Sequence, residues 1–120
     1  MRLPRSRSIT ERQTFQNVRT KGNSKAGRFF VLGTLEDDAL EGLHTGLITT
    51  KKIGNAVVRN RARRLFRAVL IKQGEAISPG RYLVFVARYT MKGASFADVE
   101  KDFLKLARRL RILKQDGGGE

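Results

Sequence analysis

The chain has 120 residues, enough for one domain with a modest core and too few for two. Lys and Arg number 25 against 11 Asp and Glu, a formal net charge of +14 at pH 7, so the folded surface favours a polyanionic partner. Hydrophobic residues make up 40% of the chain, which argues against a disordered basic tail and places the charge on a folded scaffold. Cysteine is absent, which excludes disulfides, a thiol nucleophile and thiolate metal sites.

No apolar run approaches the roughly 18 residues that a membrane-spanning helix needs, so the sequence predicts a soluble, cytoplasmic protein without a membrane partner. The first 20 residues are rich in Arg and Ser, as organellar transit peptides are. Cleaving them would remove an amphipathic segment from a chain near the lower size limit for a stable core. We predict one domain over residues 1–116 and a disordered glycine-rich tail over residues 117–120.

The first predicted element is a short helix over residues 9–20. Two capping boxes fit its start, Ser8 with Glu11 and Thr10 with Gln13. Phe15 and Val18 give the helix an apolar side, and Gly22 ends it.

Three strands are predicted from apolar and β-branched runs. The first covers residues 28–35 and leads into an acidic turn over residues 36–41. The second covers residues 43–50, whose alternation has the two-residue period of a strand, and we predict that these two strands are antiparallel neighbours. The third, over residues 81–88, is apolar almost throughout, which is typical of a central strand buried on both faces.

Two longer helices complete the pattern. One runs from Ala56 to Lys72, after a break at Gly54. The other starts with Ser95 and Asp98 as a capping box, and its apolar residues recur at threes and fours: Phe96, Val99, Phe103, Leu106, Leu110 and Leu113. The order helix, strand, strand, helix, strand, helix predicts an α+β fold, a two-layer α/β sandwich whose mixed sheet is covered by helices, with room for an extra short strand. The strand, helix and strand over residues 43–88 could form a crossover that joins two parallel neighbouring strands.

The positive charge is concentrated between Gly42 and Gly74, a segment without a single Asp or Glu. Its cations are Lys51, Lys52, Arg59, Arg61, Arg63, Arg64, Arg67 and Lys72. On a helical wheel, one face is spaced for burial and holds Val58, Ala62, Leu65, Phe66 and Val69. Arg59, Arg63 and Arg67, which we call the arginine ridge, follow another face at four-residue spacing, with Asn60 and Arg64 beside them.

Stability alone does not favour the arginine ridge, because like charges at this spacing repel by roughly a few tenths of a kcal/mol per pair. A merely solvated basic face is the plain alternative, but the missing acids and the net charge favour an anionic ligand. Arginine binds phosphate bidentately and stacks on bases, and the amide of Asn60 both donates and accepts hydrogen bonds. The pattern therefore predicts a surface that contacts RNA phosphates together with a base or a 2′-hydroxyl.

Residues 51–64, which read KKIGNAVVRNRARR, resemble the signature helix of the bacterial ribonuclease P protein subunit family, with its Arg-Asn-Arg motif. The resemblance extends over nearly the whole chain, to residues 15–18 in the first helix, Arg28 and residues 30–32 in the first strand, Gly46-Leu47 in the motif strand, and Tyr82 with Ala87-Arg88 in the last strand. Family members often carry a second aromatic one turn after the first, where this chain has Arg19.

The resemblance implies a left-handed crossover between parallel strands, against the usual right-handed rule. It also implies a role in the ribonucleoprotein endonuclease that removes 5′ leaders from precursor tRNA, with ribonuclease P RNA and precursor tRNA as partners and no DNA. The RNA subunit and its Mg²⁺ are expected to perform the hydrolysis, so the protein alone is expected to be inactive, with no catalytic residue and no organic cofactor. Implied RNA-subunit contacts are Lys51, Lys52, Arg59, Asn60, Arg61, Arg63, Arg64 and Arg67. Implied leader contacts are Arg12, Phe15, Arg19, Arg28 and Phe30.

The residues by themselves leave other interpretations open. A structural RNA-binding protein of the ribosomal type would use the same charges without a role in processing, whereas a helix-turn-helix DNA-binding protein is disfavoured by the strands between the helices. A protein nuclease would need clustered carboxylates for a metal, or a general base beside a nucleophile, and the sequence has neither pattern. Phe15, between Arg12 and Arg19, either packs in the core or borders a groove for single-stranded RNA. The single histidine, His44, is interpreted as a packing or surface residue.

Overall fold

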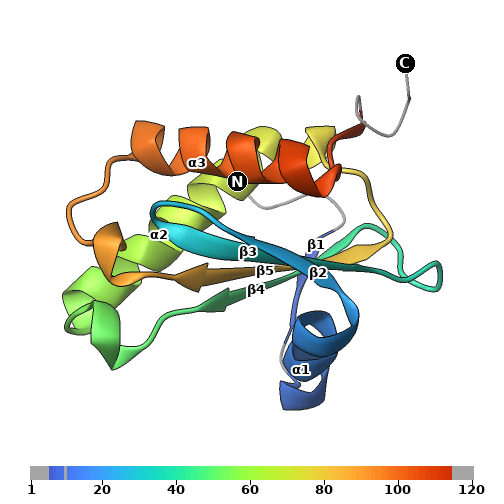
Figure 1. Ribbon diagram of the computed structural model, residues 1–120, viewed down its shortest axis with the longest axis horizontal. Helices are drawn as coiled ribbons and strands as arrows, with labels where there is room; N and C mark the ends of the chain where they lie inside the picture. The colour runs from blue at the N-terminus through green and yellow to red at the C-terminus, as the bar shows by residue number, and fades with distance from the viewer. Residues whose placement is uncertain (1–5, 10, 115–120) are drawn as a thin grey trace.

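The computed structural model describes residues 6–9 and 11–114. Its elements follow in the order β1 (Ser6–Ser8), α1 (Arg12–Lys21), β2 (Asn23–Ala26), β3 (Phe30–Glu36), β4 (Leu43–Ile48), η1 (Lys51–Ile53), α2 (Ala56–Gln73), η2 (Gly74–Ala76), β5 (Arg81–Ala87), η3 (Tyr89–Met91) and α3 (Phe96–Leu110). The strands form one mixed sheet in the order β1-β4-β5-β3-β2. Helices α2 and α3 lie on one face of this sheet and the short α1 lies on the other (Figure 1). The predicted α+β sandwich is confirmed, and the tail predicted over residues 117–120 lies outside the described residues.

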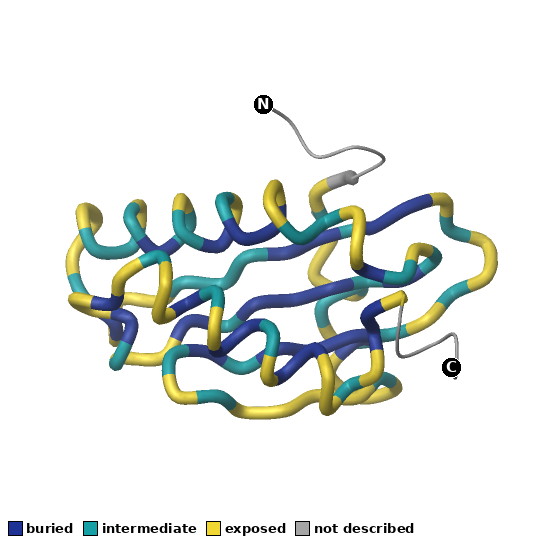
Figure 2. Tube along the Cα trace, turned by 90° about the horizontal axis from the view of Figure 1, so that it is seen from above, coloured by how far each residue is buried: buried dark blue, intermediate teal, exposed yellow. Residues whose placement is uncertain are grey.

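Strand β5 is the centre of the sheet, as its apolar sequence predicts. Its side chains alternate, so that Phe85 joins the core beneath α2 and α3 while Val84 and Val86 face the side of α1. Phe66 of α2 lies 4.9 Å from Phe85 between ring centroids, and Phe103 of α3 lies 5.8 Å from it. Figure 2 shows buried positions along the central strands and exposed positions in the connecting turns.

The strands predicted over residues 28–35 and 43–50 are not neighbours, so that prediction is wrong. Strand β5 lies between them and pairs antiparallel with β3 and parallel with β4. The physical reason is burial. Because β5 is apolar on both faces, more of its apolar surface is removed from water at the centre of the sheet, with a strand on each side, than at an edge. The parallel pairing of β4 with β5 confirms the connection predicted over residues 43–88.

The crossover from β4 through α2 to β5 is left-handed. When α2 is placed above the sheet and both strands point away from the viewer, β5 lies to the left of β4 (Figures 1 and 2). Helix α3 covers the β2–β3 half of the same face and packs beside α2. The family resemblance implied this hand, whereas the general rule for parallel strands gives the opposite one.

Two edge strands, β1 and β2, have no apolar signal in the sequence. Strand β1 pairs in parallel with β4, and β2 pairs antiparallel with β3, while the β2 side chains stay exposed. Because Ser8 belongs to β1, the capping box predicted for Ser8 and Glu11 is wrong, and Glu11 precedes α1 without a capping hydrogen bond from its side chain. The alternative box that begins at Thr10 starts outside the described residues.

Both long helices begin at side-chain caps. The side chain of Asn55 accepts a hydrogen bond from the Val58 N–H (3.1 Å) at the start of α2. At the start of α3, Ser95 and Asp98 form the predicted capping box, with each side chain accepting from the other residue's backbone N–H. These bonds to Ser95 lower the pKa of Asp98 below its ordinary value. No helix in the described ranges is long and apolar enough to cross a membrane, and the cytoplasmic location stays a prediction.

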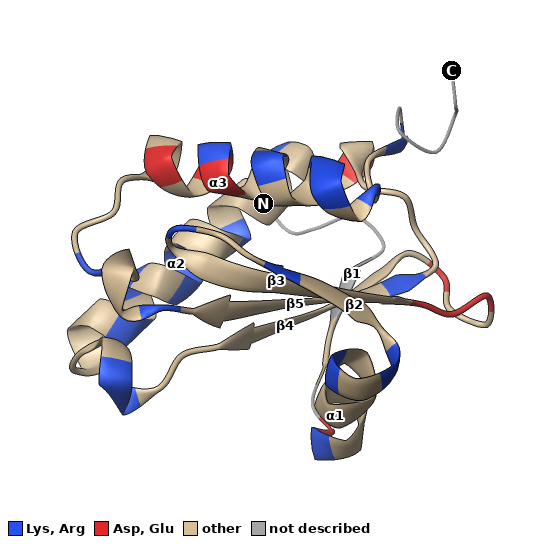
Figure 3. Cartoon of the chain, viewed as in Figure 1, with Lys and Arg blue, Asp and Glu red and all other residues tan. Residues whose placement is uncertain are grey.

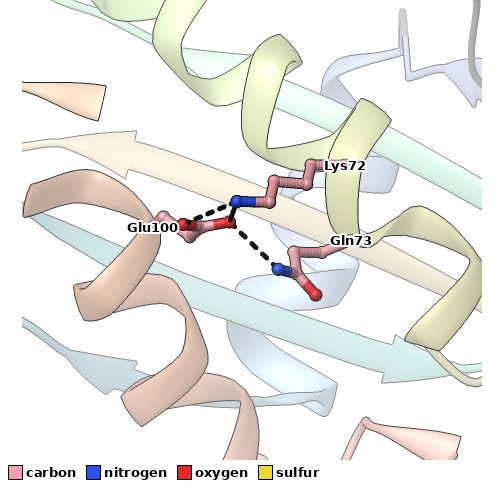
Figure 4. A network of polar contacts seen from close by, with 3 residues as sticks. All are labelled: Lys72, Gln73 and Glu100. Atoms are coloured by element: carbon pink, nitrogen blue, oxygen red, sulfur yellow. Dashed lines mark hydrogen bonds and ion pairs between the residues drawn. The ribbon is translucent and has the colours of Figure 1, made fainter. Parts of the chain in front are cut away.

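A polar network joins α2 to α3 (Figure 4). The Glu100 carboxylate pairs with Lys72 Nζ at 3.0 Å and accepts a hydrogen bond from Gln73 Nε2, also at 3.0 Å. The hydrogen bond from Lys72, and to a smaller extent the one from Gln73, lowers the pKa of Glu100. The network holds the C-terminal end of α2 beside α3 and leaves the N-terminal turns of α2 at the far end of the molecule (Figure 1).

Candidate nucleic-acid interface

The residues predicted to contact an RNA subunit all lie on η1 and α2, and together we call them the α2 basic surface: Lys51, Lys52, Arg59, Asn60, Arg61, Arg63, Arg64 and Arg67. The buried face of α2 is the predicted one, with Ala62, Phe66 and Val69 against the sheet. Opposite this face, Arg64 and Arg67 are exposed, and η1 adds two exposed lysines before the helix. Arg61 lies on the α3 side of the helix, as Lys72 does, and is therefore separated from the arginine ridge.

Short-range hydrogen bonds orient two arginines of the ridge. Arg59 Nη1 donates to the carbonyl oxygen of Gly54 (3.4 Å), and Arg63 Nη1 donates to Asn60 Oδ1 (2.9 Å). A guanidinium has five N–H donors, so each arginine keeps most of its donors for a ligand. The NH₂ group of Asn60 makes no hydrogen bond to any described residue and is also available as a donor.

Acidic side chains are held away from the arginine ridge (Figure 3). Within the described ranges the one ion pair joins Lys72 to Glu100, near the C-terminal end of α2. Asp102 is buried and accepts the backbone N–H groups of Arg28 (3.2 Å) and Phe29 (2.9 Å). The ridge therefore has no counter-ion among the described side chains, and a polyanion would supply one.

A pocket of about 510 Å³ lies between α1 and the opposite face of the sheet, and we call it the α1 pocket. Arg12, Phe15 and Arg19 line it from α1. Both arginines are exposed and Phe15 is half-buried, so the pocket combines an apolar interior with two cations at its rim. Such a combination suits an unpaired base, which stacks on the ring while its phosphates meet the guanidinium groups.

Arg28 and Phe30, the other two predicted leader contacts, do not line the α1 pocket. Phe30 is fully buried in the core beneath α2 and α3, so its placement beside the leader is wrong. The reason is the alternation along β3, in which Phe30 points to one face and Val31 to the other. Arg28 is exposed above the ring of Phe29 (5.3 Å) and lines a separate hollow near the start of α3.

Sequence reasoning missed the sheet wall of the α1 pocket. Val31, Ile48 and Val86, which lie side by side in register on β3, β4 and β5, form part of it and are only partly buried. The signal that could have found them is the two-residue alternation, because a strand that sends Phe30 into the core must send Val31 to the opposite face. An opposite face that only one short helix covers is left partly open.

Titratable groups do not gather into a metal site in the described part of the chain, where no three His, Asp or Glu side chains come together to hold an ion. His44 packs edge-on against Tyr82 with 5.7 Å between ring centroids, which agrees with the packing role predicted for it. The α2 basic surface and the α1 pocket offer ionic, hydrogen-bonding and stacking contacts.

Comparison with known proteins identifies the family. The sequence profile described as Ribonuclease P matches residues 3–111. The ribonuclease P protein component of Bacillus velezensis is 37% identical over 107 residues, which cover 89% of this chain and 91% of that protein. The RNase P protein of Staphylococcus aureus has a similar structure, with a TM-score of 0.81 at 24% identity over 89% of this chain and 97% of that one. A second S. aureus structure, of a mutant described as having defective mRNA degradation activity, matches equally well, with a TM-score of 0.81 at 24% identity over 88% of this chain and 89% of that one. The chain belongs to the ribonuclease P protein family.

Proposed function

We propose that this chain is the subunit of a ribonuclease P ribonucleoprotein that binds the catalytic RNA and the 5′ leader of precursor tRNA. The observation that carries the proposal is the α2 basic surface, which has no counter-ion among the described residues. Its Arg59-Asn60-Arg61 sequence is the motif on which the family resemblance rests. The name shared by the relatives, ribonuclease P protein component, supports an assembly in which the protein is one part.

The arginine ridge is assigned to the RNA subunit. Arg59, Arg63 and Arg67 are spaced to contact successive phosphates along one backbone; Arg67 is exposed, and the other two are half-buried. The free NH₂ group of Asn60 can donate to a 2′-hydroxyl or a base edge, which would distinguish RNA from a generic polyanion. Lys51 and Lys52 extend the positive charge beyond the N-terminus of the helix.

The α1 pocket is assigned to the leader. Phe15 offers a ring for stacking, and Arg12 and Arg19 lie one turn before and after it at the rim of the same pocket. An unpaired strand fits such a site because its bases are free to leave the stack, whereas bases of the paired acceptor stem are not. Arg28 and Phe30 are not part of this assignment, because they lie outside the pocket.

The hydrolytic step is assigned to the RNA partner and the Mg²⁺ that it binds, which supplies the charge stabilisation that phosphodiester cleavage needs. The described residues hold no carboxylate cluster suited to that ion. What the chain contributes is binding, with one surface for the catalytic RNA and another for the leader. The cations of both surfaces reduce the phosphate repulsion between the catalytic RNA and the precursor tRNA at low Mg²⁺.

Reconstitution tests the proposal. A ribonuclease P RNA is assayed for precursor-tRNA cleavage at low Mg²⁺ with and without the chain, and we expect the chain to raise the cleavage rate and the affinity for precursor. A chain that binds the RNA without changing cleavage would instead be a structural RNA-binding protein of the ribosomal type.

The isolated chain is the second arm of the same experiment. It is offered precursor tRNA and, because of the S. aureus mutant described above, an mRNA fragment, after purification through a denaturing column and refolding. We expect no cleavage of either substrate without the RNA subunit. Cleavage that follows the refolded protein through the column would contradict the assignment of hydrolysis to RNA.

A further inference from the structure

Two glycines occupy one row of the sheet on the face of α1. Gly46 of β4 and Gly33 of β3 both lie opposite Val84 of β5, so the row reads Gly46, Val84, Gly33 across three adjacent strands. Both glycines are buried. Glycine weakens a strand interior, because it has no side chain to pack and loses the most chain entropy on folding. Two in one row therefore indicate that another element must approach the sheet closely at this place.

Backbone conformation does not explain these glycines. The glycines with positive φ in the described chain are Gly42, Gly54, Gly80 and Gly93, all outside the strands. Any L-residue can adopt the backbone of Gly46 or Gly33. The reason for a glycine at these positions must therefore be sought in the space above the backbone.

The element that approaches is α1, and it approaches most closely at Gly46. A Cβ atom added to Gly46 would lie 2.8 Å from Cζ of Phe15 and still closer to its Cε1. At Gly33 an added Cβ would meet Val18 Cγ1 at 3.4 Å, which is close to ordinary van der Waals contact. The ring of Phe15 therefore rests directly on the β4 backbone, whereas Val18 leaves almost enough space for a methyl group.

We infer that Gly46 is a positioning residue that sets the height of the Phe15 ring above the sheet and thereby forms the stacking site for an unpaired leader base. The inference rests on the proposed function of the α1 pocket. The sheet blocks the ring from below, so a methyl group at residue 46 displaces it away from the sheet and toward the pocket that it lines. The displaced ring reduces the space for a base and loses its fixed orientation.

A matched pair of variants tests this role. Gly46→Ala adds a methyl group beneath the ring of Phe15, whereas Gly33→Ala adds one to the wall of the same pocket, against Val18 and away from the ring. Each variant is assembled with ribonuclease P RNA, and its affinities for precursor and mature tRNA are measured beside a thermal melt. We expect Gly46→Ala to reduce the ratio of precursor to mature affinity by about 5- to 30-fold, within the range of one lost stacking contact, and Gly33→Ala to reduce it less, because Gly33→Ala takes up pocket space but leaves the ring in place. An equal or larger reduction by Gly33→Ala would show that lost space, and not the position of the ring, sets the ratio, and would overturn the inference.

A double variant separates positioning from general damage. In the Phe15→Ala background no ring is left to displace, so adding Gly46→Ala should leave the affinity ratio where Phe15→Ala alone puts it. If Gly46→Ala does not fold, the double variant should fold, because the clash is with the ring. Failure of both to fold would show that Gly46 serves another contact and would overturn the inference.

Two further outcomes are distinguishable. If Gly46→Ala is folded and keeps the wild-type ratio of precursor to mature affinity, the positioning role is overturned while the leader pocket stands. If the wild-type assembly itself does not prefer precursor over mature tRNA, the leader pocket of the proposed function fails, and the role of Gly46 fails with it.

Discussion

At the scale of single residues, the half-buried position of Phe15 supports the leader contact proposed for it. A core phenylalanine such as Phe30 is fully enclosed, whereas Phe15 has one side of its ring on Gly46 and lines the α1 pocket. The two rings belong to opposite faces of the same sheet. Phe30 stands in an apolar run of a strand, whereas Phe15 stands among polar residues of a helix. The tertiary structure encloses the first ring in the core and leaves the second at the wall of a pocket.

We therefore predict that Phe15→Ala in the assembled ribonucleoprotein weakens precursor-tRNA binding by about 1–2 kcal/mol and leaves mature tRNA binding unchanged, because the ring stacks on a leader base. Affinities for both substrates and a thermal melt of the free protein measure the two effects. A purely core role would instead cost about 3–5 kcal/mol of unfolding free energy and would weaken both substrates equally.

Asp102 is the residue whose loss should cost the fold most among the acids of α3. Its buried carboxylate accepts the backbone N–H groups of Arg28 and Phe29, and Gly27 leaves room for it, since a Cβ there would lie 2.5 Å from Asp102 Oδ2. Asp102→Ala leaves two donors without their partner, so we expect a loss of about 2–4 kcal/mol in the free energy of unfolding.

Urea unfolding of Asp102→Ala beside Lys105→Ala measures this loss. Lys105 is exposed on the same helix, and its removal should change the unfolding free energy by less than about 0.5 kcal/mol. Equal stabilities for the two variants would show that the carboxylate is not needed to hold the start of β3.

At the scale of elements, α2 and α3 are both basic helices, but they differ in where their acids are. Helix α2 contains no acid, whereas α3 has Asp98 in its cap, Glu100 in the ion pair with Lys72, and Asp102 in the core. The exposed face of α3 still carries Lys101 and Lys105 at four-residue spacing. This similarity provides a matched control for the arginine ridge.

Arg59→Ala with Arg63→Ala should weaken binding to ribonuclease P RNA and reduce the log–log salt slope by about 1.4–1.8, the value for two lost phosphate contacts. Lys101→Ala with Lys105→Ala removes the same charge from α3 and should leave the slope nearly unchanged. Affinities measured across a salt series, with circular dichroism as the check on folding, compare the two pairs. Equal slopes for both pairs would mean that only net charge matters and that the ridge is not the contact surface.

The cap of α3 should make the helix sensitive to acid. The hydrogen bonds of Ser95 lower the pKa of Asp98, so the stabilisation by its carboxylate is present above the ordinary aspartate pKa of about 3.9 and is lost as the pH falls through the lowered value. We expect Asp98→Asn to flatten the fall of the melting temperature below about pH 4. Asp38→Asn, in the exposed turn between β3 and β4, should leave that fall unchanged.

At the scale of the whole molecule, a net charge of +14 attracts any RNA through its phosphates and does not by itself distinguish one RNA from another. We expect the free chain to bind an unrelated RNA of similar length at low salt, since most of the attraction is to phosphates. Raising the salt from 50 to 200 mM should weaken that binding by roughly 10³- to 10⁵-fold if six to ten phosphates are contacted. The affinity for ribonuclease P RNA should fall less steeply with salt. Hydrogen bonds such as those offered by Asn60 release no counterions when they form, so salt does not weaken them in this way. Parallel titrations of the two RNAs across a salt series measure the difference. Equal log–log salt slopes for the two RNAs would contradict this expectation.

The sequence by itself determined the features that depend on local patterns. Periodicity located α2, the capping box located the start of α3, and an almost fully apolar run marked β5 as the central strand. The missing acids between Gly42 and Gly74, together with the Arg-Asn-Arg motif, indicated the basic surface and the family. These signals lie within a few residues of one another along the chain, so they remain readable without the fold.

Only the tertiary structure decided what depends on long-range pairing. Strands β1 and β2 are held by backbone hydrogen bonds to the sheet edges, which need no apolar side chains and leave no pattern in the sequence. The insertion of β5 between β3 and β4 is a choice between pairings that the same sequences allow, and the hand of the crossover depends on how α2 packs on the whole sheet. The sheet wall of the α1 pocket likewise forms because Val31, Ile48 and Val86 meet in register from three separate strands. That meeting is set by strand register, which the order of residues along the chain does not specify locally.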